Sequence, residues 1–140
     1  MTHQNSPEDL RFVSELEACA LEPDQFDHRA HVRAAYVYLV DNDVERAAER
    51  MRDSLRAFLL HHGIDVSKYH ETITRAWILA VRHFMELTPA SVSADDFIRS
   101  NPRLLDSRIM LTHYSAEHLF SPKARAEFVE PDIQPIPRHE

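Results

Sequence analysis

The chain has 140 residues and a formal net charge of −7, without any run of basic residues, so we expect one domain and exclude a general nucleic-acid binder. The single glycine, Gly63, excludes the glycine-rich loops that bind dinucleotides and phosphates, and it favours helices over tight hairpins. No apolar stretch is long enough to span a bilayer, the N-terminus does not resemble a signal peptide, and the single Cys19 excludes an intrachain disulfide, so we expect a cytoplasmic protein without membrane contact.

The first predicted helix covers residues 7–20. Ser6 is a suitable N-cap, and Pro7 fits the first helical position because its missing N–H would be unpaired there in any case. Apolar residues recur at helical spacing along this segment and predict a face that packs on the core. They are Phe12, Val13, Leu16, Cys19 and Ala20. Cys19 is therefore expected to act as a small buried hydrophobic residue.

The next two predicted helices form an antiparallel hairpin. Asp27 caps a helix that runs to about Val40, and residues 41–43 form a short turn into a helix that ends near His62. Gly63 then suits the left-handed position that terminates many helices. Because the connection is short, the two helices should run antiparallel.

A fourth helix is predicted from about Lys68 to Leu87, with Ser67 as its cap, and shorter helices follow. These begin at Ser93, at Pro102 and at Ser121, each a residue type typical of helix starts. The fold class is therefore all-α, with a bundle of four main helices, several short helices and an extended proline-rich C-terminal arm. We expect a single helical domain over residues 1–140, in which about 1–6 and 129–140 are extended or flexible.

Histidines are frequent, at ten in the chain, and several should meet at one end of the bundle. His28 lies at the centre of the apolar arc of the second helix, and His31 lies at the edge of that arc. His62 continues the apolar stripe of the third helix, and His70 flanks the inner face of the fourth. The hairpin places the start of the second helix beside the end of the third. His113 joins this group if the last third of the chain returns to the same end.

Several neutral imidazoles in one place favour a transition metal. We expect His28 and His31, with His70 or His113, to hold one ion per chain, with zinc as the first choice and iron, nickel or copper as alternatives. Two other interpretations stay open, a metal-free histidine cluster that catalyses or binds a ligand, and purely structural histidines. The chain contains neither a Glu-x-x-His pair nor the H-E-x-x-H motif, which disfavours a di-iron site and a zinc-protease site.

Two residues are candidates for proton transfer at such a site. Glu71 opens the fourth helix beside His70. The alternative is that it serves the helix dipole and pairs with Arg75. Tyr114 directly follows His113. Four further residues are expected to line a pocket there. They are His62, Tyr69, Thr74 and Trp77.

Several motifs resemble those of a small bacterial family of uncharacterised all-helical proteins. They are F-x-H-x-x-H at 26–31, Y-H-E-T at 69–72, N-P-x-L-L-D at 101–106, H-Y-S at 113–115 and F-V-E-P-D at 128–132. The resemblance implies a helical fold and carries no activity. A looser likeness to DinB-like bundles, which hold a metal through three histidines, concerns the fold alone because the histidine spacing differs.

The sequence thus favours a small helical metalloprotein, a mononuclear metal-dependent enzyme that acts on a small molecule through its histidines. The alternative is a non-enzymatic helical binding or interaction module whose histidines are structural or sense pH. In both cases we expect a small-molecule substrate or ligand as partner, and a homodimer is a further expectation.

Overall fold

The computed structural model describes residues 2–139 and confirms the predicted all-α class, with no strand in this range. The α-helices are α1 Pro7–Glu17, α2 His28–Asp41, α3 Val44–His61, α4 Glu71–Leu87, α5 Ala94–Ser100, α6 Ala116–Leu119 and α7 Pro122–Ala126. The short 3₁₀ segments are η1 Pro23–Gln25, η2 Val66–Lys68, η3 Pro102–Leu105 and η4 Ser107–Thr112. Within residues 2–139, no helix has the length and apolar character needed to cross a membrane.

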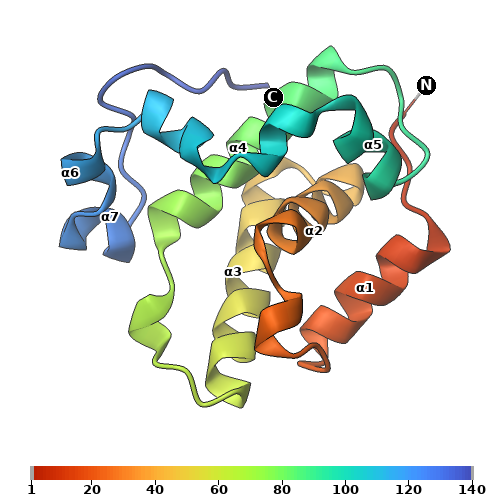
Figure 1. Ribbon diagram of the computed structural model, residues 1–140, viewed down its shortest axis with the longest axis horizontal. Helices are drawn as coiled ribbons and strands as arrows, with labels where there is room; N and C mark the ends of the chain where they lie inside the picture. Colours follow the sequence, from red (N-terminus) through yellow and green to blue (C-terminus); the bar gives the residue numbers. More distant parts are fainter. Residues whose placement is uncertain (1, 140) are drawn as a thin grey trace.

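Helix α2 occupies the centre of the molecule and packs against α1, α3, α4 and α5 (Figure 1). Its buried residues lie on every side of the helix, which is the pattern of a helix enclosed by others. They are Ala30, Val32, Ala34, Ala35, Tyr36, Val37, Tyr38 and Leu39. The two buried tyrosine hydroxyls are hydrogen-bonded, that of Tyr36 to the Gln4 carbonyl and that of Tyr38 to Ser54 and Glu17. The central helix therefore leaves neither phenol without a partner.

Polar side chains fix where the main helices begin. Ser6 and Asp9 form a reciprocal capping box at α1, while Asp27 caps α2 and Asp43 caps α3. Helix α4 begins later than predicted, at Glu71, because residues 66–68 form η2 instead. The predicted cap Ser67 lies inside this 3₁₀ turn, so the prediction for the start of α4 was wrong by one turn.

Helix α1 also ends earlier than predicted, at Glu17. Cys19 lies beyond the helix in a left-handed conformation, with a φ of 58°, and is only half-buried. The prediction that it lies on the inner face of the helix was therefore wrong. This turn directs the chain back so that Leu21 enters the core, where the burial of its side chain offsets the unusual backbone conformation.

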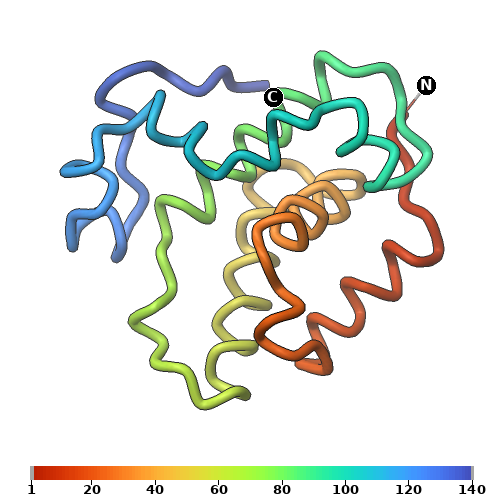
Figure 2. The backbone as a smooth tube through the Cα atoms, in the orientation of Figure 1, coloured from red at the N-terminus to blue at the C-terminus, as the bar shows by residue number. Residues whose placement is uncertain are grey.

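The chain after α4 wraps over this helix as short helical pieces and then an arm without regular secondary structure (Figure 2). Thr72 on α4 anchors the start of the arm, because its hydroxyl donates to the Glu127 carbonyl and accepts the Val129 N–H. The Tyr114 hydroxyl donates to the Val129 carbonyl at 2.7 Å. Ile136 is buried near the end of the arm. Packing and hydrogen bonds thus hold the arm on the helices.

Asp9 should be one of the most important residues for stability. Its carboxylate is buried and accepts hydrogen bonds from the backbone N–H groups of Ser6 and Ala94 and from the side chain of Arg33, so it joins α1, α2 and α5. We expect Asp9→Ala to lower the free energy of unfolding by about 3 kcal/mol in urea denaturation. Glu8→Ala is the matched control at an exposed neighbouring position. Equal effects of the two changes would contradict this assignment.

Candidate functional site

Histidine rings join distant segments of this protein by hydrogen bonds to backbone carbonyls. Six rings lie at 2.8 or 2.9 Å from a carbonyl oxygen in another part of the chain. The pairs are His3 with Met85, His28 with Leu104, His62 with Leu21, His70 with Leu119, His113 with Gln134, and His118 with Glu130. These carbonyls lie in loops, in short helical segments or in the last turn of a helix, where no backbone N–H of a long helix is available to pair with them. The imidazole N–H groups supply the missing donors.

His70 uses both ring nitrogens in this way. Its Nδ1 accepts the Ile73 N–H at 3.1 Å and caps α4, while its Nε2–H donates to the Leu119 carbonyl at 2.8 Å. These partners fix the neutral tautomer, and burial lowers the pKa of His70. His70 therefore holds the start of α4 against α6, and neither nitrogen is free for a metal.

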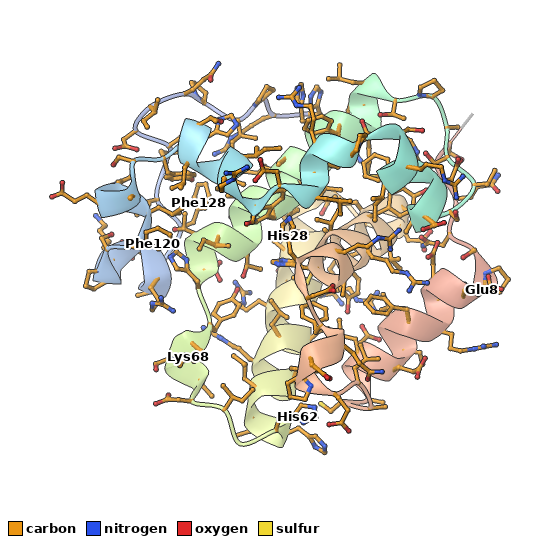
Figure 3. The ribbon with its side chains drawn as sticks, in the orientation of Figure 1. Glu8, His28, His62, Lys68, Phe120 and Phe128 are labelled. Carbon is orange, nitrogen blue, oxygen red and sulfur yellow. The ribbon has the colours of Figure 1, made fainter. Side chains whose placement is uncertain are left out.

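Neither expected trio of histidine ligands, His28 and His31 with His70 or with His113, assembles within residues 2–139. Within residues 2–139, no group of three or more histidine, cysteine, aspartate or glutamate side chains is placed to hold a metal ion. The segment before His113 does return to His28 and His31, but the His113 ring bonds to the C-terminal arm instead. His62 lies at the far end of α3, well apart from His28 (Figure 3). Carbonyls in separate segments thus hold these rings apart.

The two residues predicted to transfer protons also have structural partners. Glu71 accepts the hydroxyl of Tyr69 at 2.6 Å and pairs with Arg52, whereas the expected partner Arg75 pairs with Glu45. Tyr114 is fully buried, and burial raises its pKa well above the usual range. Neither residue lines the cavity described next.

A cavity of about 280 Å³ lies between the start of α2, α4 and the η4–α6 segment. It is lined by His28, His31, Ile73, Trp77, Ser107, Arg108, Met110, Leu111, Leu119 and Phe120. The His28 ring meets the face of Trp77 edge-on, with ring centroids 4.6 Å apart, and donates to the Leu104 carbonyl. His28 and Trp77 thus form a fixed aromatic wall.

His31 differs from the histidines with carbonyl partners. Its Nε2 is buried and has no hydrogen-bond partner within residues 2–139. Burial, with a smaller contribution from the nearby His28, lowers the pKa of His31 to about 4. The ring is therefore neutral at physiological pH and keeps one buried polar nitrogen available. A buried polar atom without a partner is uncommon and calls for an explanation.

A second cavity, of about 430 Å³, adjoins the first between α3 and the start of α4. It is lined by Pro23, Phe26, Leu55, Phe58, Leu59, Ile64, Lys68, Tyr69, His70, Ile73, Thr74 and Arg125. Ile73 lines both cavities, and the Phe26 ring lies 6.0 Å from that of His31 between centroids. Of the predicted pocket residues, the structure places Tyr69 and Thr74 here and Trp77 in the first cavity, whereas His62 lines neither.

No family model, curated protein or solved structure matches this chain. The resemblance noted from the motifs therefore gains no activity from a characterised relative. We therefore infer the function from the residues of the site itself.

Hydrophobic periodicity did not predict the cavity mouth. Leu111 and Phe120 line the first cavity and remain 41% and 57% exposed, so they lie where it opens to solvent. Both lie in or beside short irregular segments that have no hydrophobic periodicity. Each ends a short apolar run, at 109–111 and at 119–120, but only the folded chain shows that they share one opening.

Acid should destabilise the protein through His31. The unfolded chain takes up this proton near the ordinary pKa of 6.5, whereas the folded chain takes it up only near 4. Stability is therefore full above the ordinary value and falls as the pH decreases toward the folded value. We expect the urea midpoint to decrease from neutral pH to about pH 5 by less in His31→Leu than in the wild type. The exposed His61→Leu control should keep the wild-type pH dependence, and an equal loss in both variants would contradict the assignment.

Proposed function

We propose that this protein binds a small, largely apolar molecule in the cavity lined by His31, His28 and Trp77. The unpartnered Nε2 of His31 is the observation that supports the proposal. A ligand with one hydroxyl, carbonyl or amide group would supply the missing hydrogen bond, while the aromatic wall and the apolar residues would enclose the rest. A cavity with few polar groups among apolar and aromatic side chains is typical of small-molecule sites.

The energetics support this interpretation over a purely structural histidine. An unsatisfied buried polar atom costs about 1–3 kcal/mol, and a leucine at the same place would avoid that cost. Residues that lower stability without local compensation are typical of functional sites. The imidazoles with carbonyl partners avoid this cost, the buried ring of His70 among them, so the buried Nε2 of His31 is the exception that binding of a ligand would explain.

Binding is a better match than proton transfer for His31. An efficient general base has a pKa near the working pH. The pKa of His31, at about 4, makes the ring a weak base in neutral solution. A neutral imidazole can still donate or accept one hydrogen bond, which is what recognition of an uncharged polar group requires.

The metal-dependent enzyme is the second candidate, because His28 and His31 line the same cavity. A metal there would have to take Nε2 of His28 away from the Leu104 carbonyl, or use its other ring nitrogen, and would find further ligands outside the protein. Elemental analysis of the untagged protein distinguishes the two candidates. About one bound ion per chain, lost in His28→Ala and His31→Ala, would favour the metal.

Ligand binding can be measured through Trp77, the single tryptophan of the chain, which lines the cavity. We expect small apolar alcohols or amides to change its fluorescence and to raise the melting temperature. The variant His31→Leu should be about 1 kcal/mol more stable at neutral pH and should bind these compounds more weakly. The exposed His61→Leu variant should behave as the wild type. A less stable His31→Leu variant with unchanged ligand binding would overturn the proposal.

A further inference from the structure

We infer that the ligand is an elongated apolar carboxylic acid, whose chain passes from the second cavity into the first; this rests on the proposed function. The carboxylate would lie beside Lys68 and Arg125, the apolar chain along α3 and α4, and a neutral polar group at the inner end beside His31. Continuity of the two cavities, their apolar lining and their charge lead to this ligand class.

Continuity comes from the residues between the cavities. Ile73 lines both hollows, and Phe26 of the second packs against His31 of the first. The two linings therefore meet at these side chains. Their volumes of about 430 and 280 Å³ fit a ligand that is longer than either cavity.

The second cavity presents an apolar interior. The rings of Phe26 and Phe58 lie 5.8 Å apart between centroids and face Leu55, Leu59, Ile64 and Ile73 of the same lining. The polar groups there have partners within the protein, because the Tyr69 hydroxyl donates to Glu71 and the Thr74 hydroxyl to the His70 carbonyl. An apolar chain would therefore bury its surface there without depriving a polar group of a bond.

The charge of the lining is opposite to that of the whole protein. The chain carries 23 acidic and 16 basic residues, yet no aspartate or glutamate lines either cavity. Three cations do, and one of them, Arg108, is neutralised by a two-pronged contact with Asp106. Within residues 2–139, neither Lys68 nor Arg125 has a carboxylate within ion-pair distance. These two cations are thus available for an anion.

The backbone places the two cations together. Arg125 on α7 donates to the carbonyls of Ser67 and Lys68, so its guanidinium lies against the segment that carries the lysine. Lys68 is exposed and lies at the outer side of the molecule (Figure 3). A carboxylate here would keep part of its hydration, whereas beside the neutral, buried His31 it would be desolvated without an opposite charge. The acid end therefore belongs outside and the neutral end inside.

The experiment compares four series of compounds, from six to ten carbons. They are straight-chain acids, the matching amides, ω-hydroxy acids and ω-hydroxy amides, titrated against the full chain by Trp77 fluorescence. We expect acids to bind about tenfold more tightly than amides. Lys68→Glu should remove this preference. Lys123→Glu, at the other lysine of the chain, lies on exposed α7 outside both cavities and should retain it.

A second pair of variants tests the path of the chain. Leu59→Asp places a charge in the second cavity, whereas Leu60→Asp does so at a neighbouring side chain that is 72% exposed. Only the first should weaken binding of the acids, and both should keep the helical circular dichroism of the wild type.

The outcomes separate the two proposals. Acids that bind no better than amides, or a preference that survives Lys68→Glu, would overturn the carboxylate inference. A preference for ω-hydroxy compounds that disappears in His31→Leu would still support the proposed function in that case. If the wild type bound none of the compounds, both proposals would be overturned. If the acids bound Leu59→Asp as tightly as the wild type, the path of the ligand through the second cavity would be overturned.

Discussion

The hydrogen bond from an imidazole N–H to a distant backbone carbonyl is the interaction on which this structure depends. The chain after α4 consists of short helical pieces, which pair few of their own carbonyls. Histidines supply the missing donors, as His28 does for Leu104 and His70 for Leu119. These bonds attach the irregular segments to α2 and α4, and those segments supply one wall of the first cavity. Histidine suits this task because its ring spans a gap between elements and tolerates burial in the neutral form.

This use of histidine also explains where the sequence was informative. The hydrophobic periodicity of α2 and α3 and the caps Asp27 and Asp43 depend on neighbouring residues only, and they predict these helices well. The start of α4 does not depend on neighbouring residues only. Its cap is the imidazole of His70, whose tautomer is fixed by the Leu119 carbonyl from a distant segment. The left-handed residue at Cys19 has no local cue either, since the core position of Leu21 determines it.

In the candidate site, too, some features follow from the local sequence and others only from the folded chain. Position on a helical arc places His28 and His31 toward the interior, and both do line a common cavity. The place of a histidine on the helical arc does not show whether its ring nitrogens already have hydrogen-bond partners. The expected metal site required those nitrogens to be free. His113 and His62 face carbonyls whose location only the folded chain defines. The availability of His31 is therefore a property of the tertiary structure, although its inward direction is a property of the sequence.

The two hydrogen bonds of the His70 ring link two parts of the structure. The same ring caps α4 and holds Leu119, which is part of the wall of the first cavity, while His70 itself lines the second. Release of this ring would fray the first turn of α4 and loosen α6 in one event. Opening of the cavities and local unfolding of this region would then occur together. The rate of opening would depend on how fast the two hydrogen bonds of His70 break. Because burial lowers the pKa of His70, the neutral ring keeps this cap in place as the pH falls below the value at which an ordinary histidine takes up a proton.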